Sequence, residues 1–187
     1  MKSPFCFLVN PVNNQRYDNV KKISDVEFII SSTKEDHTIS NRFAKVISTP
    51  INYKGAIKPG DTLLVHHNVF KLFYDMKGVE KSGRSFLKDN EFLVDQDQFF
   101  AYKQNEKWYA NYDYCFIKPS LKEKSIIFSN DTYQPLTGHI KINNKYLEDL
   151  GLKLGDKVCF RPNSEYEFKI DGEKVYRVRC KNVTIKL

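Results

Sequence analysis

Four histidines and four cysteines are the side chains of this 187-residue chain best suited to metal binding or nucleophilic catalysis. His66 and His67 are adjacent in a predicted strand, so we expect their side chains on opposite faces, where they cannot readily share a metal ion. His37 and His139 have no partner at ligand spacing. The histidines therefore do not favour a metal site.

The cysteines, Cys6, Cys115, Cys159 and Cys180, contain no C-x-x-C pair and lie in apolar or alternating runs, which is typical of buried thiols in a reducing compartment. Cys159 is expected to pack in a strand rather than to act as a nucleophile. The segment GVEKSGRS (Gly78–Ser85) lacks the spacing of a phosphate-binding loop and predicts a flexible hairpin tip. We expect no enzymatic activity and no cofactor.

The elements that hold these residues are predicted to be strands. Aromatic residues make up 14% of the chain, and long runs with helical periodicity are scarce. One helical turn is predicted over NKYLEDL, residues 144–150, ended by Gly151. The predicted strands are Phe5–Asn10, Ala44–Ser48, Thr62–His66, Glu91–Val94, Phe99–Lys103, Tyr114–Lys118, His139–Ile142, Lys157–Phe160, Tyr166–Ile170 and Lys174–Cys180.

The sequence predicts a soluble, cytoplasmic protein. No stretch of 18 consecutive apolar residues occurs, and the apolar run in MKSPFCFLVNP is too short for a signal peptide. The net charge of +7 is compatible with nucleic acid or an acidic partner surface, although the lysines are scattered as on solvated strand faces.

A short motif occurs twice. IKPGDTLLV (Ile57–Val65) returns 95 positions later as LKLGDKVCF (Leu152–Phe160). Three other landmarks return in the same order: FLVNP as CFIKP at an offset of 108, FIIS as IIFS at 98, and QFFAY as NVTIK at 84. The ordered matches predict that the chain contains two copies of one unit.

The two predicted copies differ in their loops. We expect a first domain at residues 1–108, with insertions at about 12–27 and about 70–88, and a compact second domain at residues 109–187. The Lys-x-Gly-Asp stretch suits a turn, because Gly takes positive φ and Asp bonds nearby N–H groups. IDGEK (Ile170–Lys174) predicts a hairpin.

The order of these landmarks resembles the GroES-like co-chaperonin family. In the second copy GHIKI, LKLGDKVCF and IDGEKVYRV match the family pattern continuously from Gly138 to Ile185, and in the first copy AKVIS, IKPGDTLLV and NEFLVDQDQFFAY fill the same roles. The resemblance covers most of the chain. It implies an all-β fold of two small GroES-like β-barrels in tandem, with long loops in the first.

The resemblance also implies a function. Family members form a homo-oligomeric ring that caps a GroEL-type chaperonin ring and assists ATP-dependent protein folding, each contributing an apolar tripeptide on a mobile loop. The matching tripeptide is Phe28, Ile29 and Ile30, on the loop NNQRYDNVKKISDVE, whose composition suits a segment that becomes ordered on binding. Val20 and Ile23 complete the expected partner-binding set. Secondary candidates are Ile126, Ile127 and Phe128, after the shorter loop SLKEKS.

One departure from the family pattern concerns the residues before the tripeptide. The family usually has small residues there, often Gly-Gly, whereas this chain has Asp25, Val26 and Glu27. A stiffer loop, or a tripeptide presented differently, is therefore expected. Both tripeptides also fit ordinary buried strands.

A basic β-barrel protein that binds nucleic acid or acts as an assembly scaffold, without a chaperonin partner, is the alternative. Small barrels bind single strands by aromatic stacking and backbone charge. Residues suited to such a platform are Trp108, Tyr109, Tyr112 and Tyr114, with Lys103, Lys107 and Lys118.

Overall fold

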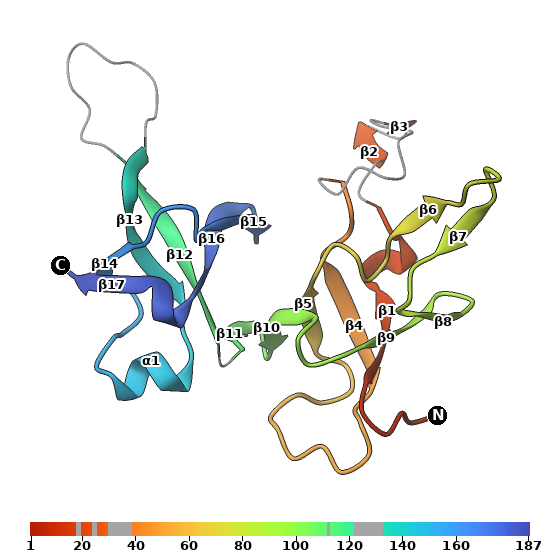
Figure 1. Cartoon of the computed structure of the whole chain (residues 1–187), viewed down its shortest axis with the longest axis horizontal. Coiled ribbons are helices and arrows are strands. Elements are labelled where there is room, and N and C mark those ends of the chain that lie inside the picture. Colours follow the sequence, from red (N-terminus) through yellow and green to blue (C-terminus); the bar gives the residue numbers. More distant parts are fainter. Residues whose placement is uncertain (18–19, 24–25, 30–38, 112, 122–132) are drawn as a thin grey trace. The chain divides into compact units, whose positions relative to one another are not determined.

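The computed structural model describes residues 1–17, 20–23, 26–29, 39–111, 113–121 and 133–187, and the side chains of 20–23 and 26–29 are not described. Contacts divide the chain into two units, Met1–Glu106 and Lys107–Leu187, so the boundary lies two residues before the sequence-based one. Both units are built from antiparallel strands (Figure 1). The all-β prediction is confirmed.

Six strands of the first unit pair in one sheet, in the order β10-β5-β4-β1-β9-β8. Two small two-stranded sheets, β2-β3 and β6-β7, come from the insertions. The bounds are β1 Phe7–Pro11, β2 Val20–Ile23, β3 Val26–Ile29, β4 Phe43–Ser48, β5 Thr62–Val65, β6 Leu72–Tyr74, β7 Glu80–Ser82, β8 Phe86–Lys88, β9 Glu91–Val94 and β10 Phe99–Gln104.

Six strands of the second unit form its sheet, in the order β17-β14-β13-β12-β16-β15. The bounds are β11 Lys107–Ala110, β12 Tyr114–Leu121, β13 Tyr133–Ile142, β14 Lys157–Phe160, β15 Tyr166–Ile170, β16 Glu173–Arg179 and β17 Val183–Lys186. The predicted helical turn is α1, Lys145–Asp149, and two short 3-10 turns lie at Val12–Asn14 and Cys180–Asn182. Each of the ten predicted strands overlaps an observed one.

The two sheets have the same strand order when β12, β13, β14, β15, β16 and β17 are matched to β1, β4, β5, β8, β9 and β10. The register matches too, since Val9 pairs with Val46 in one unit and Ile117 with Ile140 in the other. In both units the register shifts just before this residue of β1 or β12. Val9 and Ile117, 108 positions apart, are therefore structurally equivalent, as are Val46 and Ile140, 94 positions apart.

The last strand of each sheet repeats the same irregularity. Phe99 pairs with Val65, and Val183 pairs with Phe160, and in both ladders the register shifts after this pair. The predicted equivalence of QFFAY and NVTIK is therefore confirmed. The remaining landmark pair, FIIS and IIFS, extends beyond the described residues.

The repeated Gly-Asp turns take the same conformation. Gly60 and Gly155 have φ of 96° and 86°, in the region where a side chain is strained. Each donates its N–H to a carbonyl of the neighbouring strand, that of Val46 or Ile140, at 2.8 Å. Sequence similarity at these turns therefore reflects one shared way of entering β5 and β14.

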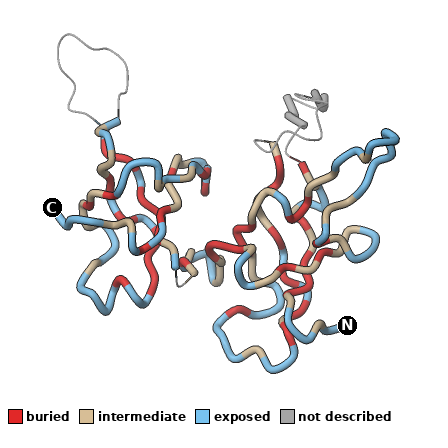
Figure 2. The backbone as a smooth tube through the Cα atoms, in the orientation of Figure 1, coloured by how far each residue is buried: buried red, intermediate tan, exposed pale blue. Residues whose placement is uncertain are grey.

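Each unit has its own hydrophobic core (Figure 2). Equivalent positions contribute to both cores, for example Val46 and Ile140, or Leu63 and Val158. Phe7 in the first core packs edge-on against Tyr53 and Phe99, with ring centroids 5.0 and 5.5 Å apart. Burial of these side chains contributes about 1.5–3 kcal/mol each.

The predicted barrels are not seen as closed sheets. Among the described residues, β15 and β17 end the second sheet and β8 ends one side of the first, so strand pairing closes neither sheet on itself. The longest α-helix in the described ranges, α1, has five residues, and no helix there could span a bilayer.

Candidate functional site: the two insertions of the first unit

The first insertion leaves the sheet after β1 and returns at β4. Within it β2 and β3 pair as an antiparallel hairpin, with Val20 opposite Ile29 and Lys21 opposite Phe28. An isolated bridge between Tyr17 and Ser40 closes the base of the insertion. We call residues 12–17 together with 39–42 the neck.

Asn41 holds the two sides of the neck together. Its side-chain N–H groups donate to the carbonyls of Val12 and Gln15, at 3.0 and 2.7 Å, and its oxygen accepts from the N–H of Phe43 at 2.9 Å. The residue is buried. A buried amide with all these partners fixes where the insertion starts and ends.

The neck is also bonded to the second insertion. Leu72 at the start of β6 donates its N–H to the Tyr17 hydroxyl at 2.8 Å, and Arg16 donates to the Ser82 hydroxyl at 3.1 Å. The Arg16 guanidinium lies 5.0 and 4.8 Å from the ring centroids of Phe86 and Phe92. Burial lowers the pKa of Arg16, but its ordinary value is so high that the charge persists.

The second insertion is a structured hairpin. β6 pairs with β7, and its tip lies at residues 75–79, so the predicted tip at Gly78–Ser85 is displaced toward the N-terminus. Asp75 orders this tip, because its carboxylate accepts from the N–H groups of Lys77 and Val79, both at 2.9 Å. The tip is therefore hydrogen-bonded to the Asp75 side chain.

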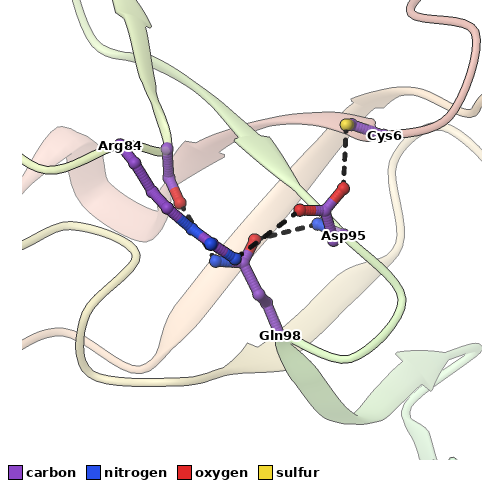
Figure 3. A network of polar contacts seen from close by, with 5 residues as sticks. Cys6, Arg84, Asp95 and Gln98 are labelled. Carbon is purple, nitrogen blue, oxygen red and sulfur yellow. Dashed lines mark hydrogen bonds and ion pairs between the residues drawn. The ribbon is translucent and has the colours of Figure 1, made fainter.

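A polar network fixes the point where the second insertion rejoins the sheet (Figure 3). Gln98 donates from its side chain to the Ser85 hydroxyl at 3.3 Å and accepts from the Asp95 N–H at 2.9 Å. The Asp95 carboxylate contacts Arg84 at 3.9 Å and accepts from the Cys6 thiol at 3.0 Å. Burial, and next the bond to Asp95, raise the pKa of that thiol. An open groove of about 520 Å³ lies beside this network.

The predicted partner-binding residues fall in and around the β2-β3 hairpin. Val20 and Ile23 are the first and last residues of β2, and Phe28 and Ile29 lie in β3. Ile30 lies outside the described residues. The secondary candidates Ile126, Ile127 and Phe128 also lie outside the described residues. They fall between Leu121, at the end of β12, and Tyr133, at the start of β13, and these two residues pair with each other.

The histidine prediction was partly wrong. β5 ends at Val65, so His66 and His67 follow the strand, and their rings lie together with centroids 4.0 Å apart rather than on opposite faces. The described residues hold no group of three or more His, Cys, Asp or Glu side chains placed to bind a metal ion.

Two of the cysteines form a thiol pair in the second unit. The Cys115 and Cys180 thiols are hydrogen-bonded, and the Asn144 amide donates to Cys180 Sγ at 3.1 Å. These bonds lower the pKa of Cys180, whereas the bond to Cys180, and next burial, raise that of Cys115. No disulfide joins the four cysteines, all of which lie in described ranges.

The residues of the alternative platform are engaged by neighbours. Trp108 donates to the Asp171 carboxylate at 3.0 Å, and Lys118 pairs with Glu173 at 2.8 Å. Lys103 pairs with Glu106 at 2.7 Å in the first unit, and Lys107 lies 5.4 Å from the Tyr109 ring centroid in the second. Tyr114 stacks with Arg177, and Tyr112 lies outside the described residues. Much of this charge is therefore locally neutralised.

Sequence reasoning missed the neck, although the signal was present in part. Arg16, Tyr17 and Asn41 are a cation, an aromatic and an amide inside a polar segment, where a fully solvated loop does not require them. The partners of Tyr17 and Arg16, Leu72 and Ser82, are 55 and 66 residues away. No family model matches this chain, and no curated protein is similar enough in sequence to count as a relative.

Proposed function

We propose that this chain is a tandem co-chaperonin-like protein that caps a GroEL-type chaperonin ring in the cytoplasm and assists ATP-dependent folding. The observation that carries the proposal is the repeated topology: two units with one strand order and register, of which the first has a β-hairpin insertion between its first two sheet strands. Each unit is then a GroES-like barrel whose sheet is not closed by strand pairing.

The insertion supplies the contact with the chaperonin. Its apolar residues Phe28, Ile29 and Ile30 enter a groove of the partner, with Val20 and Ile23 beside them. Burial of three large apolar side chains contributes about 1.5–3 kcal/mol each, and the conformational entropy lost on binding offsets part of it. Each contact is therefore weak, and a ring of several copies binds firmly through avidity.

Self-association has a candidate surface in the second unit. β17 is the end strand of its sheet, and Ile185 and the following Leu187 are 56% and 63% exposed. In β10 of the first unit, Ala101 stands at the position equivalent to Ile185 and is buried. An edge strand with exposed apolar side chains is suited to pairing with another chain. This surface supports the homo-oligomeric ring of the proposal.

The test is ATP-dependent co-elution with a GroEL-type chaperonin, followed by the chaperonin ATPase rate. Wild-type chain should co-elute and change the ATPase rate, and a Phe28→Ser/Ile29→Ser/Ile30→Ser variant should do neither. A Leu150→Ser/Leu154→Ser variant, changed at two exposed apolar positions of the second unit, is the control and should behave as wild type. Absence of any nucleotide-dependent interaction with the wild-type chain would refute the proposal. Native mass tests the ring, because a monomer contradicts it.

A second candidate function is nucleic-acid binding by the second unit. Arg177 lies 5.1 and 5.2 Å from the ring centroids of Tyr114 and Tyr166, and Lys174 lies 5.3 Å from those of Tyr133 and Tyr176. Such aromatic and cationic side chains suit stacked bases. This candidate ranks second because Lys174 also pairs with Glu167 at 2.7 Å. Oligonucleotide affinity that falls steeply with salt would favour it.

A further inference from the structure

The β6-β7 hairpin exposes an unusual number of apolar side chains for its length. Met76 at the tip is fully exposed, and Phe73, Tyr74 and Val79 are 38%, 49% and 50% exposed. The second unit has no counterpart: residues 66–85 separate β5 from β8, whereas only residues 161–165 separate β14 from β15. The repeated fold therefore does not need this hairpin.

The hairpin holds these side chains on an ordered backbone. The Asp75 carboxylate caps the tip, and the Asp75 N–H donates to the Val79 carbonyl at 3.0 Å. At the base, Gly83 donates to the Lys71 carbonyl at 3.0 Å, and Leu93 donates to the Ser85 carbonyl at 2.7 Å. A tip with a hydrogen-bonded backbone loses little backbone conformational entropy when a partner covers it.

The hairpin starts and ends beside the neck of the first insertion. The Tyr17 hydroxyl accepts from Leu72 at the start of β6, and Arg16 donates to Ser82 at the end of β7. The two insertions are therefore joined at their bases, although they are far apart in sequence. A partner that takes the first insertion lies within reach of the second.

We propose that the β6-β7 hairpin is a second docking element for the same chaperonin ring, an inference that rests on the proposed function. The hairpin would enter an apolar groove with an acidic rim on the chaperonin. The segment from Lys71 to Arg84 carries four cationic side chains, Lys71, Lys77, Lys81 and Arg84, against Asp75 and Glu80. The four cations outnumber the two carboxylates, so the hairpin presents a net basic border around its apolar side chains, although Arg84 also contacts Asp95 at 3.9 Å. Charge complementarity then requires acidic residues on the partner.

The β6-β7 hairpin and the first insertion make two separate contacts with the partner. The first insertion supplies the apolar tripeptide, and the β6-β7 hairpin supplies a hydrogen-bonded surface that covers a neighbouring part of the same partner. Two joined contacts on one chain strengthen each other, because the first raises the effective concentration of the second. The expected result is a chaperonin affinity that depends on both insertions.

The first test compares three variants in chaperonin binding with ATP present. Tyr74→Ser/Met76→Ser/Val79→Ser should weaken binding by about tenfold or more, on the scale of one or more buried apolar side chains. Leu150→Ser/Leu154→Ser, changed at two exposed apolar positions of the second unit, should bind as wild type. The Phe28/Ile29/Ile30 serine variant is the reference for loss of the loop. Hydrogen exchange of β5 and β9 verifies that the hairpin variant is folded.

The outcomes separate this inference from the proposed function. If wild type binds, the loop variant fails and the hairpin variant binds unchanged, the hairpin inference is overturned and the co-chaperonin proposal stands. If wild type does not bind, the proposed function fails and the inference fails with it. Photo-crosslinking from a benzophenone amino acid at position 76 identifies the protein that the hairpin contacts. Cross-links to the chaperonin support the inference, whereas cross-links only to a second copy or to a folding substrate overturn it.

Discussion

Asp61 and Asp156 lie 95 positions apart in the chain and make the same hydrogen bond. Each carboxylate accepts the backbone N–H of the lysine three residues before it, Lys58 at 2.8 Å and Lys153 at 2.7 Å. Their second contacts differ: Asp61 accepts from the Gln104 amide at 3.0 Å, and Asp156 pairs with Lys186. The backbone of the turn is thus repeated, while the side chains that reach it from the last strand have diverged.

Replacing the turn glycines should destabilise each unit separately. Gly60→Ala and Gly155→Ala each place a side chain on a backbone with positive φ. The added Cβ would meet no neighbouring atom, so the expected cost is backbone strain alone, about 1 kcal/mol each. Amide hydrogen exchange should show faster opening of β4 and β5 in the first variant, and of β13 and β14 in the second. Equal effects of both variants on both units would contradict two separate cores.

Gly138 should not tolerate a side chain, although its equivalent Ala44 carries one. A Cβ at position 138 would collide with the Lys118 carbonyl and the Ile117 side chain. We expect Gly138→Ala to lower the free energy of unfolding of the second unit by about 1–3 kcal/mol, as overpacking does. Urea denaturation followed by hydrogen exchange measures this. The reverse change, Ala44→Gly, should cost only about 1 kcal/mol, and a larger loss there would refute the comparison.

Glu173 should make the second unit sensitive to acid. Hydrogen bonds from Lys118 and from Lys141, at 2.8 and 2.7 Å, lower the pKa of Glu173 from its ordinary 4.5 to about 2. Its contribution to stability is therefore complete above about pH 4.5 and is lost as the pH falls toward about 2.

The variant Glu173→Gln tests this dependence. It should be less stable than wild type at pH 7, and the difference should vanish near pH 2, measured as the urea midpoint across the pH range. Since both lysines are half exposed, 0.5 M salt should reduce the difference at pH 7. A difference that persists unchanged at pH 2 would rule out the ion pairs as its cause.

The neck should lose its structure when Asn41 is truncated. Asn41→Ala removes three hydrogen bonds at a buried position and should cost about 2–3 kcal/mol, since the carbonyls of Val12 and Gln15 lose their donors. Thermal or urea unfolding gives the value. Gln15→Ala, at an exposed neighbouring position that contributes its backbone carbonyl, is the control and should change stability by less than about 0.5 kcal/mol.

Much of the fold could be predicted because strands have a local sequence pattern, the alternation of apolar and polar residues. The alternation in LKLGDKVCF and IDGEKVYRV gave both the strands and the turns, and the order of landmarks gave the correspondence of the two units. The error at His66 and His67 came from extending β5 one residue too far. A strand end depends on hydrogen bonding, here the Val69 N–H donating to the His66 carbonyl at 3.0 Å, which no periodicity reveals.

The site could be predicted only in part. Phe28 and Ile29 were placed in a loop by resemblance, and the hairpin that contains them was not foreseen. The bonds that join the insertions, between Tyr17 and Leu72 and between Arg16 and Ser82, link residues far apart in sequence, so no local pattern contains them. Gly78 and Gly83 predict a hairpin tip, but the two hydrogen bonds that the Asp75 carboxylate accepts from the tip backbone follow from no local pattern.

The matching register shifts before Val9 and Ile117, and after Phe99 and Val183, bear on the descent of the chain. Irregularities of this kind, such as an extra residue in one strand, are conserved within families. Two units that share both irregularities point to one ancestral gene segment, which already carried them when it was duplicated and fused. The insertions of residues 12–42 and 66–85 differ between the copies, so they record what changed afterwards.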